Sequence, residues 1–361
     1  MGFREEPFGG PRGCRGAMGS EGGESMRVGL IGAGRIGSIH AGTLAAHPGV
    51  GSLVVADHDA DLAKTLAARH GAQTASSKDD LFGQVECVVI ASPTDTHVDY
   101  LLRAAERGVP AFCEKPIAMD LEDTDRAIGA VGEAGIPVQM GFMRRFDPGY
   151  RAAHELVAAG DLGEVTLVRG HTHDTVPPHE SYIPRSGGVF VDMLIHDIDV
   201  LRFVTGAEPV EVVATGTNRA MEVFARYDDL ATVAVTAHMD DGSLAVLSGT
   251  RQDPLGYDIR MEVFGTKDSV AVGLDAHTPI RSLEPGAPPP AEPVTTGWLE
   301  RFEQAYRAEM DAFVDVARGL RPSPCTLEDA RAALVIAQAC ALSAREGGPA
   351  PVEGERLGGK R

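Results

Sequence analysis

A glycine-rich segment near the start of the chain restricts the fold more than any other feature. A short apolar run, Met26–Ile31, leads directly into Gly32-Ala33-Gly34-Arg35-Ile36-Gly37, and a helical run over Ser38–Ala46 follows. In a strand–loop–helix context this spacing is typical of a dinucleotide-binding unit. The three glycines permit, in turn, a tight turn, close approach of a pyrophosphate to the backbone, and close packing of helix on strand. The helix N-terminus then offers unpaired N–H groups to the phosphates.

A single carboxylate favours NAD over NADP. Asp57 ends the next predicted strand, Ser52–Ala56, 20 positions beyond Gly37. A carboxylate at this place hydrogen-bonds the ribose hydroxyls and repels a 2′-phosphate. Arg35 beside the glycine loop could help to hold a 2′-phosphate, so the strictness of the preference stays open. The alternative that the loop serves no nucleotide also stays open.

The first part of the chain alternates between strand-like and helix-like segments. Six apolar strands separated by helices over residues 26–145 predict a doubly wound parallel sheet, the Rossmann fold. Polar residues follow two of these strands: Ser92–His97 comes after Cys87–Ala91, and Glu114-Lys115-Pro116 comes after Ala111–Cys113. Ligands of open α/β sheets bind at the C-terminal ends of the strands, so both segments are candidate site loops.

The second part is rich in β-type segments. After Phe146 short turns join most of them, which predicts an α+β domain on a large, mostly antiparallel sheet. We count Met221–Tyr227 among its strands, and two amphipathic helices close the chain. The predicted organisation is a disordered extension over 1–25, an NAD-binding domain over 26–145, a substrate-binding and oligomerisation domain over 146–345, and a flexible tail over 346–361.

Composition excludes several classes of protein. The 361 residues include 33 Lys and Arg against 52 Asp and Glu, a formal charge of -19, which argues against nucleic acid or an anionic membrane as partner. No apolar run approaches the roughly 20 residues that a membrane-spanning helix needs. The five cysteines show no C-x-x-C spacing, as in reduced cytoplasmic proteins without a zinc site.

One apolar segment, Gly187–Phe203, carries ionisable residues at helical spacing. It predicts a single buried helix, and Asp192, His196 and Asp199 fall on one stripe at i, i+4 and i+7. Three interpretations are open: a core pair that satisfies itself, half of a metal site, or a general base with its orienting acid. His171 and His173 share a strand face and could complete a metal site, but nothing brings all four together, and we predict no metal.

Several segments together resemble the glucose–fructose oxidoreductase/inositol dehydrogenase (Gfo/Idh/MocA) family of two-domain nicotinamide-dependent dehydrogenases. The resemblance spans about residues 26 to 345, and its last two motifs are most similar to the inositol 2-dehydrogenase branch. The segments that carry it are Gly32–Gly37, Ser92–His97, Glu114-Lys115-Pro116, Gly141-Phe142-Met143-Arg144-Arg145-Phe146-Asp147, and Asp192 with His196 in Leu-Ile-His-Asp-Ile-Asp.

The resemblance implies that Lys115, Asp192 and His196 form the catalytic group. Elementary chemistry agrees, because a dehydrogenase must take the hydroxyl proton while hydride goes to the nicotinamide. Histidine suits the base, and a lysine can stabilise the developing alkoxide. Asp192 would orient His196 or hold a neighbouring hydroxyl, and as a charged partner it should raise the pKa of His196.

The remaining candidate residues follow from the same resemblance. The residues expected to bind NAD, besides the glycine loop and Asp57, are Ser92, Thr94, His97, Glu114, Lys115 and Arg144. Those expected to bind substrate, besides the catalytic group, are Met143, Asp174 and Tyr257. Asp174 departs from the amide-type residue of the inositol branch, which leaves the identity of the polyol open.

The expected activity is NAD-dependent oxidation of a cyclic polyol, myo-inositol to its 2-keto product, in the cytoplasm. Alternatives are a scyllo-inositol or aldose dehydrogenase, a redox-assisted glycoside hydrolase that retains NAD, or a non-catalytic NAD sensor. The family also implies a homo-oligomer, a tetramer or dimer, formed through a sheet face on which we place Val233, Val235 and Val246.

Overall fold

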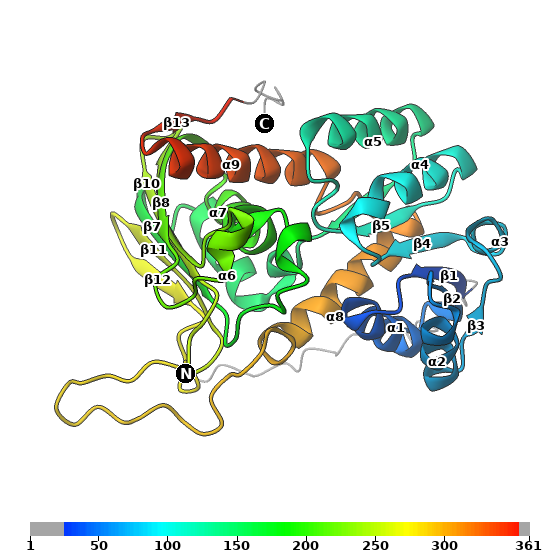
Figure 1. Ribbon diagram of the computed structural model, residues 1–361, viewed down its shortest axis with the longest axis horizontal. Coiled ribbons are helices and arrows are strands. Elements are labelled where there is room, and N and C mark those ends of the chain that lie inside the picture. Colours follow the sequence, from blue (N-terminus) through cyan, green and yellow to red (C-terminus); the bar gives the residue numbers. More distant parts are fainter. Residues whose placement is uncertain (1–24, 354–361) are drawn as a thin grey trace, which may run out of the picture.

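The computed structural model describes residues 25–353, which form two sheets with their helices (Figure 1). The predictions for residues 1–24 and 354–361 lie outside this range. The first sheet has six parallel strands in the order β3-β2-β1-β4-β5-β6, which confirms the doubly wound fold. Its strands are β1 (Met26–Ile31), β2 (Val50–Ala56), β3 (Gln73–Thr74), β4 (Cys87–Ile90), β5 (Ala111–Glu114) and β6 (Val138–Gly141).

Helices cover both faces of the parallel sheet. In Figure 1, α4 and α5 lie on one side and α1 and α2 on the other. Aspartate caps begin two of them and left-handed glycines end them: Asp59 and Gly71 bound α2, and Asp120 and Gly135 bound α5. The helices are α1 (Arg35–Ala46), α2 (Ala60–His70), α3 (Lys78–Phe82), α4 (His97–Arg107) and α5 (Leu121–Ala134).

The second sheet has seven strands in the order β12-β11-β7-β10-β9-β8-β13. All neighbours are antiparallel except β7 and β10, which run parallel. The C-terminal ends of β7 and β10 therefore meet at one edge of the sheet. The strands are β7 (Val165–His173), β8 (Pro209–Thr217), β9 (Thr232–Met239), β10 (Leu244–Thr250), β11 (Asp258–Gly265), β12 (Ser269–Val272) and β13 (Ala350–Pro351).

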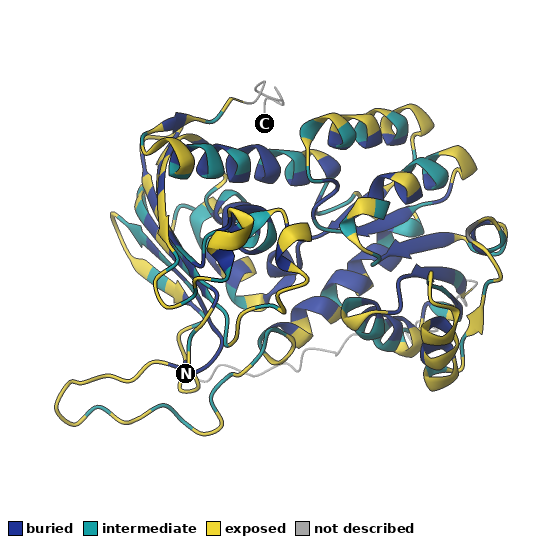
Figure 2. Cartoon of the chain, viewed as in Figure 1, coloured by how far each residue is buried: buried dark blue, intermediate teal, exposed yellow. Residues whose placement is uncertain are grey.

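Four helices accompany this sheet. Helices α6 (Pro148–Ala158), α7 (Ile195–Thr205) and α9 (Leu327–Glu346) lie on its inner side, and α8 (Trp298–Ala317) runs across to α1 and β6 (Figure 1). In Figure 2 the dark blue of buried residues follows the parallel strands and much of α8. The α8 helix is thus packed in the junction between the two sheets.

The structure corrects two expectations about the second domain. Met221–Tyr227 is not a strand; its last part, Phe224–Tyr227, is a 3-10 helix, because only Phe224 is fully buried and local turns satisfy the backbone. Residues 346–353 are not a flexible tail either. The α9 helix ends at Glu346, and Ala350 then pairs with Val212 of β8.

The face assigned to the valines is also partly wrong. Side chains alternate along a strand, and Val233 and Val235 of β9 point toward the helices, each 2% exposed. Val246 of β10 lies on the outer face, 38% exposed, as expected. Within residues 25–353, no helix combines the length and the apolar character that crossing a membrane requires.

Candidate active site

The glycine loop between β1 and α1 has the shape that a dinucleotide requires. Gly32 has a φ of +106°, and a Cβ there would lie 2.4 Å from the carbonyl oxygen of Ala91. A Cβ on Gly37 would lie 1.9 Å from the Gly32 carbonyl oxygen, so neither position tolerates a side chain. At Gly34 nothing lies within 4 Å of the Cβ position, which leaves the backbone open to a ligand. These residues therefore fit a bound NAD.

The neighbouring groups agree with this fit. Helix α1 begins without a side-chain cap or an acidic residue in its first turn, so its N–H groups remain available to phosphates. Asp57 is held at the end of β2: its Oδ2 accepts a hydrogen bond from the Ala33 N–H at 2.7 Å. The Arg35 guanidinium lies over the Trp298 ring of α8, 5.8 Å from its centroid.

The loops after β4 and β5 are tied together by His97. Its two ring nitrogens each lie 2.8 Å from a carbonyl oxygen, that of Pro116 and that of Ser92, and burial lowers its pKa. The Ser92 hydroxyl also lies 2.7 Å from the hydroxyl of Thr96, which belongs to the short 3-10 helix Thr94–Thr96. His97 is 1% exposed, so it supports the cofactor-facing loops from inside.

Glu114 also faces the interior. Its Oε1 lies 2.7 Å from Nε2 of His40 on α1. The Glu309 carboxyl of α8 completes this cluster, since one ligand atom from each of the three residues lies within 4.8 Å of the others. Both Glu309 oxygens are buried without a hydrogen-bond partner in the described part of the chain. Burial, and then the charge of Glu114, hold the pKa of Glu309 well above its usual value.

Lys115 reaches from the first domain to the second. Its Nζ donates a hydrogen bond to the backbone carbonyl oxygen of Asp192 at 2.7 Å. Burial lowers the pKa of Lys115, against the opposing effect of the Asp192 and Glu114 charges. The Lys115 side chain therefore loses its proton at a lower pH than an exposed lysine does.

The Asp192 side chain has partners that the sequence did not reveal. Its Oδ2 accepts a hydrogen bond from Nη1 of Arg251 at 2.6 Å, and its Oδ1 accepts one from the hydroxyl of Tyr182 at 2.8 Å. Burial alone would raise the pKa of Asp192, but the charges of Lys115 and Arg251 outweigh it and keep the pKa below the usual value. Asp192 is thus an ionised acceptor.

His196 does not have Asp192 as its partner. The segment Phe190–Leu194 is a π-helical turn, and the α-helix α7 begins only at Ile195, so the expected i, i+4 stacking is lost. Within residues 25–353, Nδ1 of His196 is buried and has no hydrogen-bond partner. Burial and the positive charges of Lys115 and Arg144 lower its pKa well below 6.5, so the expectation of a raised pKa was wrong. The neutral ring packs edge-on against Phe142.

Two adjacent arginines fix α7 beneath this site. Nη1 of Arg144 lies 2.8 Å from Asp197, and Nη2 of Arg145 lies 2.7 Å from Asp199. Arg144 is 1% exposed and also donates to the Thr172 hydroxyl, so its guanidinium serves a buried ion pair instead of the cofactor surface that we predicted. Asp199 is likewise fully buried and is held by Arg145.

The remaining predicted substrate residues, Asp174, Met143 and Tyr257, differ in exposure. Asp174 follows β7 directly; its N–H bonds the carbonyl oxygen of Thr250, which precedes Arg251. Burial raises the pKa of Asp174 to about 6. Met143 and Tyr257 are buried, 4% and 8% exposed. Arg251 was missed by the sequence analysis, although it directly follows β10 as Asp174 directly follows β7.

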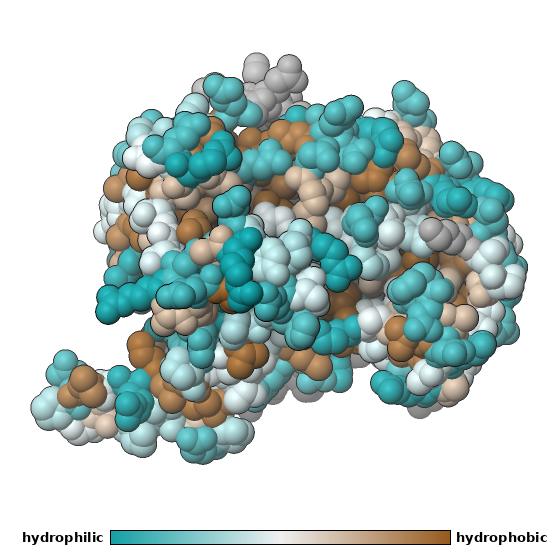
Figure 3. All heavy atoms as spheres, in the orientation of Figure 1, coloured by the Kyte–Doolittle hydropathy of each residue, from teal (hydrophilic) through white to brown (hydrophobic). Residues whose placement is uncertain are grey.

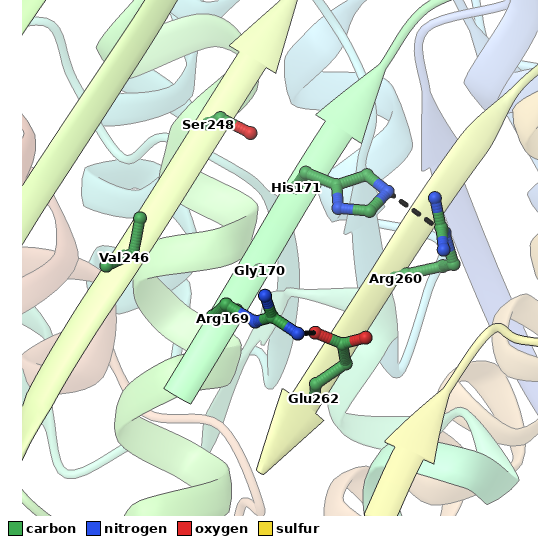
Figure 4. A pocket seen from close by; sticks show the side chains of 7 residues that line it. All are labelled: Arg169, Gly170, His171, Val246, Ser248, Arg260 and Glu262. Carbon is green, nitrogen blue, oxygen red and sulfur yellow. Dashed lines mark hydrogen bonds and ion pairs between the residues drawn. The ribbon is translucent and has the colours of Figure 1, made fainter. Parts of the chain in front are cut away.

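A separate pocket lies on the outer face of the second sheet (Figure 4). It includes His171, whose Nε2 accepts a hydrogen bond from Arg260 at 3.1 Å, and an ion pair between Arg169 and Glu262. His171 and His173 point away from Thr172, which faces α7, so they cannot share a site with Asp192 and His196. The four-residue metal hypothesis is therefore wrong.

Comparison with known proteins matches both halves of the chain. Residues 26–142 match the model of an oxidoreductase family with an NAD-binding Rossmann fold, and residues 150–271 match the GFO/IDH/MocA C-terminal domain. The myo-inositol dehydrogenase Hyg17 of Streptomyces leeuwenhoekii is 38% identical over 327 residues, which cover 89% of this chain and 98% of the relative.

Solved structures extend the likeness to three dimensions. A myo-inositol dehydrogenase from Corynebacterium glutamicum has a TM-score of 0.84 at 37% identity, covering 92% of this chain and all of the other (100%). A scyllo-inositol dehydrogenase from Lactobacillus casei, solved with NAD(H) and scyllo-inositol, has a TM-score of 0.83 at 29% identity, covering 91% and 99%. The chain belongs to the GFO/IDH/MocA family of NAD-binding oxidoreductases.

Proposed function

We propose that this oxidoreductase oxidises a secondary hydroxyl of a cyclic polyol, myo-inositol to its 2-keto product, with NAD as the hydride acceptor. The observation that carries the proposal is the meeting of Lys115, ionised Asp192 and neutral His196 at the C-terminal end of β5. Inositol dehydrogenases among the relatives and solved structures support the substrate class.

Each residue of this group has one task. His196 is a neutral acceptor and takes the proton of the reacting hydroxyl, while NAD, when bound, takes the hydride from the same carbon. The Lys115 ammonium donates a hydrogen bond to that oxygen and stabilises the negative charge that develops on it. Asp192 accepts a hydrogen bond from a neighbouring hydroxyl, which orients the ring.

We assign the cofactor to the open side of the glycine loop. Gly34 and the N–H groups of Arg35 and Ile36 would receive the pyrophosphate, and Asp57 the ribose hydroxyls. Ser92 and Thr94 would line the cofactor site at the C-terminal end of β4. The charge of Asp57 favours NAD over NADP, because a 2′-phosphate would meet a carboxylate there.

The substrate would then occupy the space between Lys115 and the end of β7. Asp174 interacts electrostatically with Arg251, Asp192 and Lys115, which supports a role for it beside the reacting group. Met143 and Tyr257, both buried, would form apolar parts of the substrate site.

A spectrophotometric screen tests the proposal. The purified protein is incubated with NAD or NADP and with myo-inositol, scyllo-inositol, aldoses or an aryl glycoside, and NADH is followed. We expect stoichiometric NADH with myo-inositol. Faster reduction with scyllo-inositol or an aldose would reassign the substrate, and glycoside cleavage without net NADH would indicate redox-assisted hydrolysis. Cofactor binding without turnover of any compound would indicate a sensor.

We also propose a homotetramer that forms through the outer face of the second sheet, in the cytoplasm. Val213, Leu244 and Val246 expose 44%, 38% and 38% of their surface there. The loop between β12 and α8 projects from the body (Figures 1 and 3), and its Leu283 is 93% exposed. Sedimentation of the wild type and of Val246→Glu tests the assembly.

The free, buried cysteines in the described range suit a reducing compartment, which supports the cytoplasm as the location.

A further inference from the structure

Tyr182 occupies an unusual position beside the candidate active site. It precedes the 3-10 turn Ile183–Arg185, in the segment between β7 and α7, and 42% of its surface is exposed. Its hydroxyl nevertheless donates a hydrogen bond to Oδ1 of Asp192 at 2.8 Å, and only 15% of the Asp192 side chain is exposed. Tyr182 therefore lies at the solvent side of a nearly buried catalytic carboxylate.

The inner side of the same carboxylate is held by Arg251. This residue is 2% exposed and donates to Oδ2 of Asp192 at 2.6 Å. Its Nη2 also lies 3.7 Å from Oδ2 of Asp229, whose other oxygen accepts the Val189 N–H at the start of the helical segment. Arg251 thus anchors Asp192 from within, and of the two donors to the carboxylate only Tyr182 is exposed.

The charges around Tyr182 keep its hydroxyl protonated. Burial and then the charge of Asp192 raise the pKa of Tyr182, against the opposing effect of Arg251 and Arg35. Arg35 is the first residue of α1, next to the glycine loop. Tyr182 therefore lies within electrostatic reach of Asp192 and of Arg35 beside the glycine loop.

We propose that Tyr182 is a specificity-determining residue that, together with Asp192, binds the polyol hydroxyl adjacent to the one that is oxidised. A phenol has one hydrogen to donate, and Asp192 receives it. The phenolic oxygen can still accept a hydrogen bond, and so can the carboxylate. A substrate hydroxyl beside this pair donates to one of these oxygens, whereas a substrate without that hydroxyl leaves the remaining acceptor capacity of the pair unused. This inference rests on the proposed polyol dehydrogenase activity.

The test compares Tyr182→Phe with Tyr227→Phe. Tyr227 is a matched control because it is 37% exposed and its hydroxyl also donates to a carboxylate, Oε1 of Glu180 at 3.0 Å, which is not part of the catalytic group. Steady-state kinetics are measured with myo-inositol and with a deoxy-inositol that lacks a hydroxyl adjacent to C2. The affinity for NAD and the Tm of each variant are measured in parallel.

We expect Tyr182→Phe to lose about 10- to 100-fold in kcat/KM for myo-inositol, mainly through KM, as for a hydrogen bond within a charged network. With the deoxy-inositol, the kcat/KM values of the variant and the wild type should differ by less than about threefold, since the hydroxyl that Tyr182 would bind is already missing. Tyr227→Phe should match the wild type with both compounds.

Three results would overturn the inference. If Tyr182→Phe behaves like Tyr227→Phe in a wild type that oxidises inositol, Tyr182 does not read the substrate, and the proposed function stands. If it loses the same factor with both compounds, or loses Tm and activity together, the contact is structural. If the wild type oxidises no polyol, the proposed function fails and the inference with it.

Discussion

The Nζ atom of Lys115 lies 2.7 Å from the backbone carbonyl oxygen of Asp192, and this hydrogen bond joins the two domains at the candidate active site. Lys115 follows β5 of the parallel sheet, whereas Asp192 lies in the π-helical turn before α7. The lysine is therefore positioned by a main-chain atom, which a side-chain substitution at Asp192 would leave in place.

Replacing Lys115 should remove catalysis and leave the cofactor site intact. Lys115→Met keeps the length of the side chain and deletes the ammonium group, so kcat should fall by about 100-fold or more. NAD affinity, measured by fluorescence quenching, should stay within about threefold. Lys64→Met is the control, because that lysine is exposed on α2 and forms a surface ion pair. A near-normal kcat in Lys115→Met would remove the residue from the mechanism.

The pH dependence should reflect a neutral His196. Its pKa is lowered well below 6.5 by burial and by the charges of Lys115 and Arg144, so protonation inactivates the base only in acid solution. We expect kcat/KM for alcohol oxidation to rise with pH through an apparent pKa below 6.5 and to vary little from this cause at neutral pH. A folded His196→Asn protein should be nearly inactive, and its residual activity should not show this rise with pH. An apparent pKa at or above 6.5 in the wild-type pH–rate profile would mean that another group is the base.

Cofactor selection should depend on the charge of Asp57. Asp57→Ser keeps a hydrogen-bonding side chain near the Ala33 N–H and removes the repulsion of a 2′-phosphate, so the ratio of kcat/KM values for NAD and NADP should fall about tenfold. Asp61→Ser, an exposed carboxylate on α2, should leave the ratio unchanged. If the wild type already uses both cofactors equally, the electrostatic argument is incorrect and Arg35 compensates for Asp57.

The buried carboxyl of Glu309 should make stability depend on pH. Its folded-state pKa is raised above the unfolded value by burial and by Glu114, so the folded protein holds a proton that the unfolded chain releases. Stability is therefore lost as pH rises above the ordinary glutamate range toward the folded pKa. Glu309→Gln is always neutral, and its Tm advantage over the wild type should grow by about 2 °C or more between about pH 5 and about pH 8. Glu303→Gln, on the exposed side of α8, should show no such trend.

The parallel sheet and the glycine loop could be predicted because their signals are local. The spacing of Gly32, Gly34 and Gly37 directly encodes a turn and a close helix–strand contact, and the structure places Cβ-excluding atoms at the first and last of them. Helix α7 ends by the same kind of local rule, since its C-cap Gly206 has a left-handed backbone conformation. Neighbouring residues determine such features without help from the rest of the fold.

Helical periodicity gave the wrong interaction partner for His196 in the second domain. Asp192 and His196 are four residues apart, which in an α-helix would bring them together, but the π-helical turn over Phe190–Leu194 directs Asp192 elsewhere. A backbone irregularity of this kind depends on how the segment packs, and the side-chain pattern of the segment was compatible with a regular helix. The predicted strand at Met221–Tyr227 was wrong for a similar reason. Its side-chain pattern was compatible with a strand, but the backbone forms local turns there and a 3-10 helix over Phe224–Tyr227.

By itself the sequence determined the nucleotide loop and the doubly wound parallel sheet of the first domain. Only the tertiary structure decided which charges meet. Arg251 reaches Asp192 because β10 lies parallel to β7, and Lys115 reaches it because the two domains pack together. Those contacts join residues 59 and 77 positions apart, so they set the pKa values of the site through distances that no local pattern encodes.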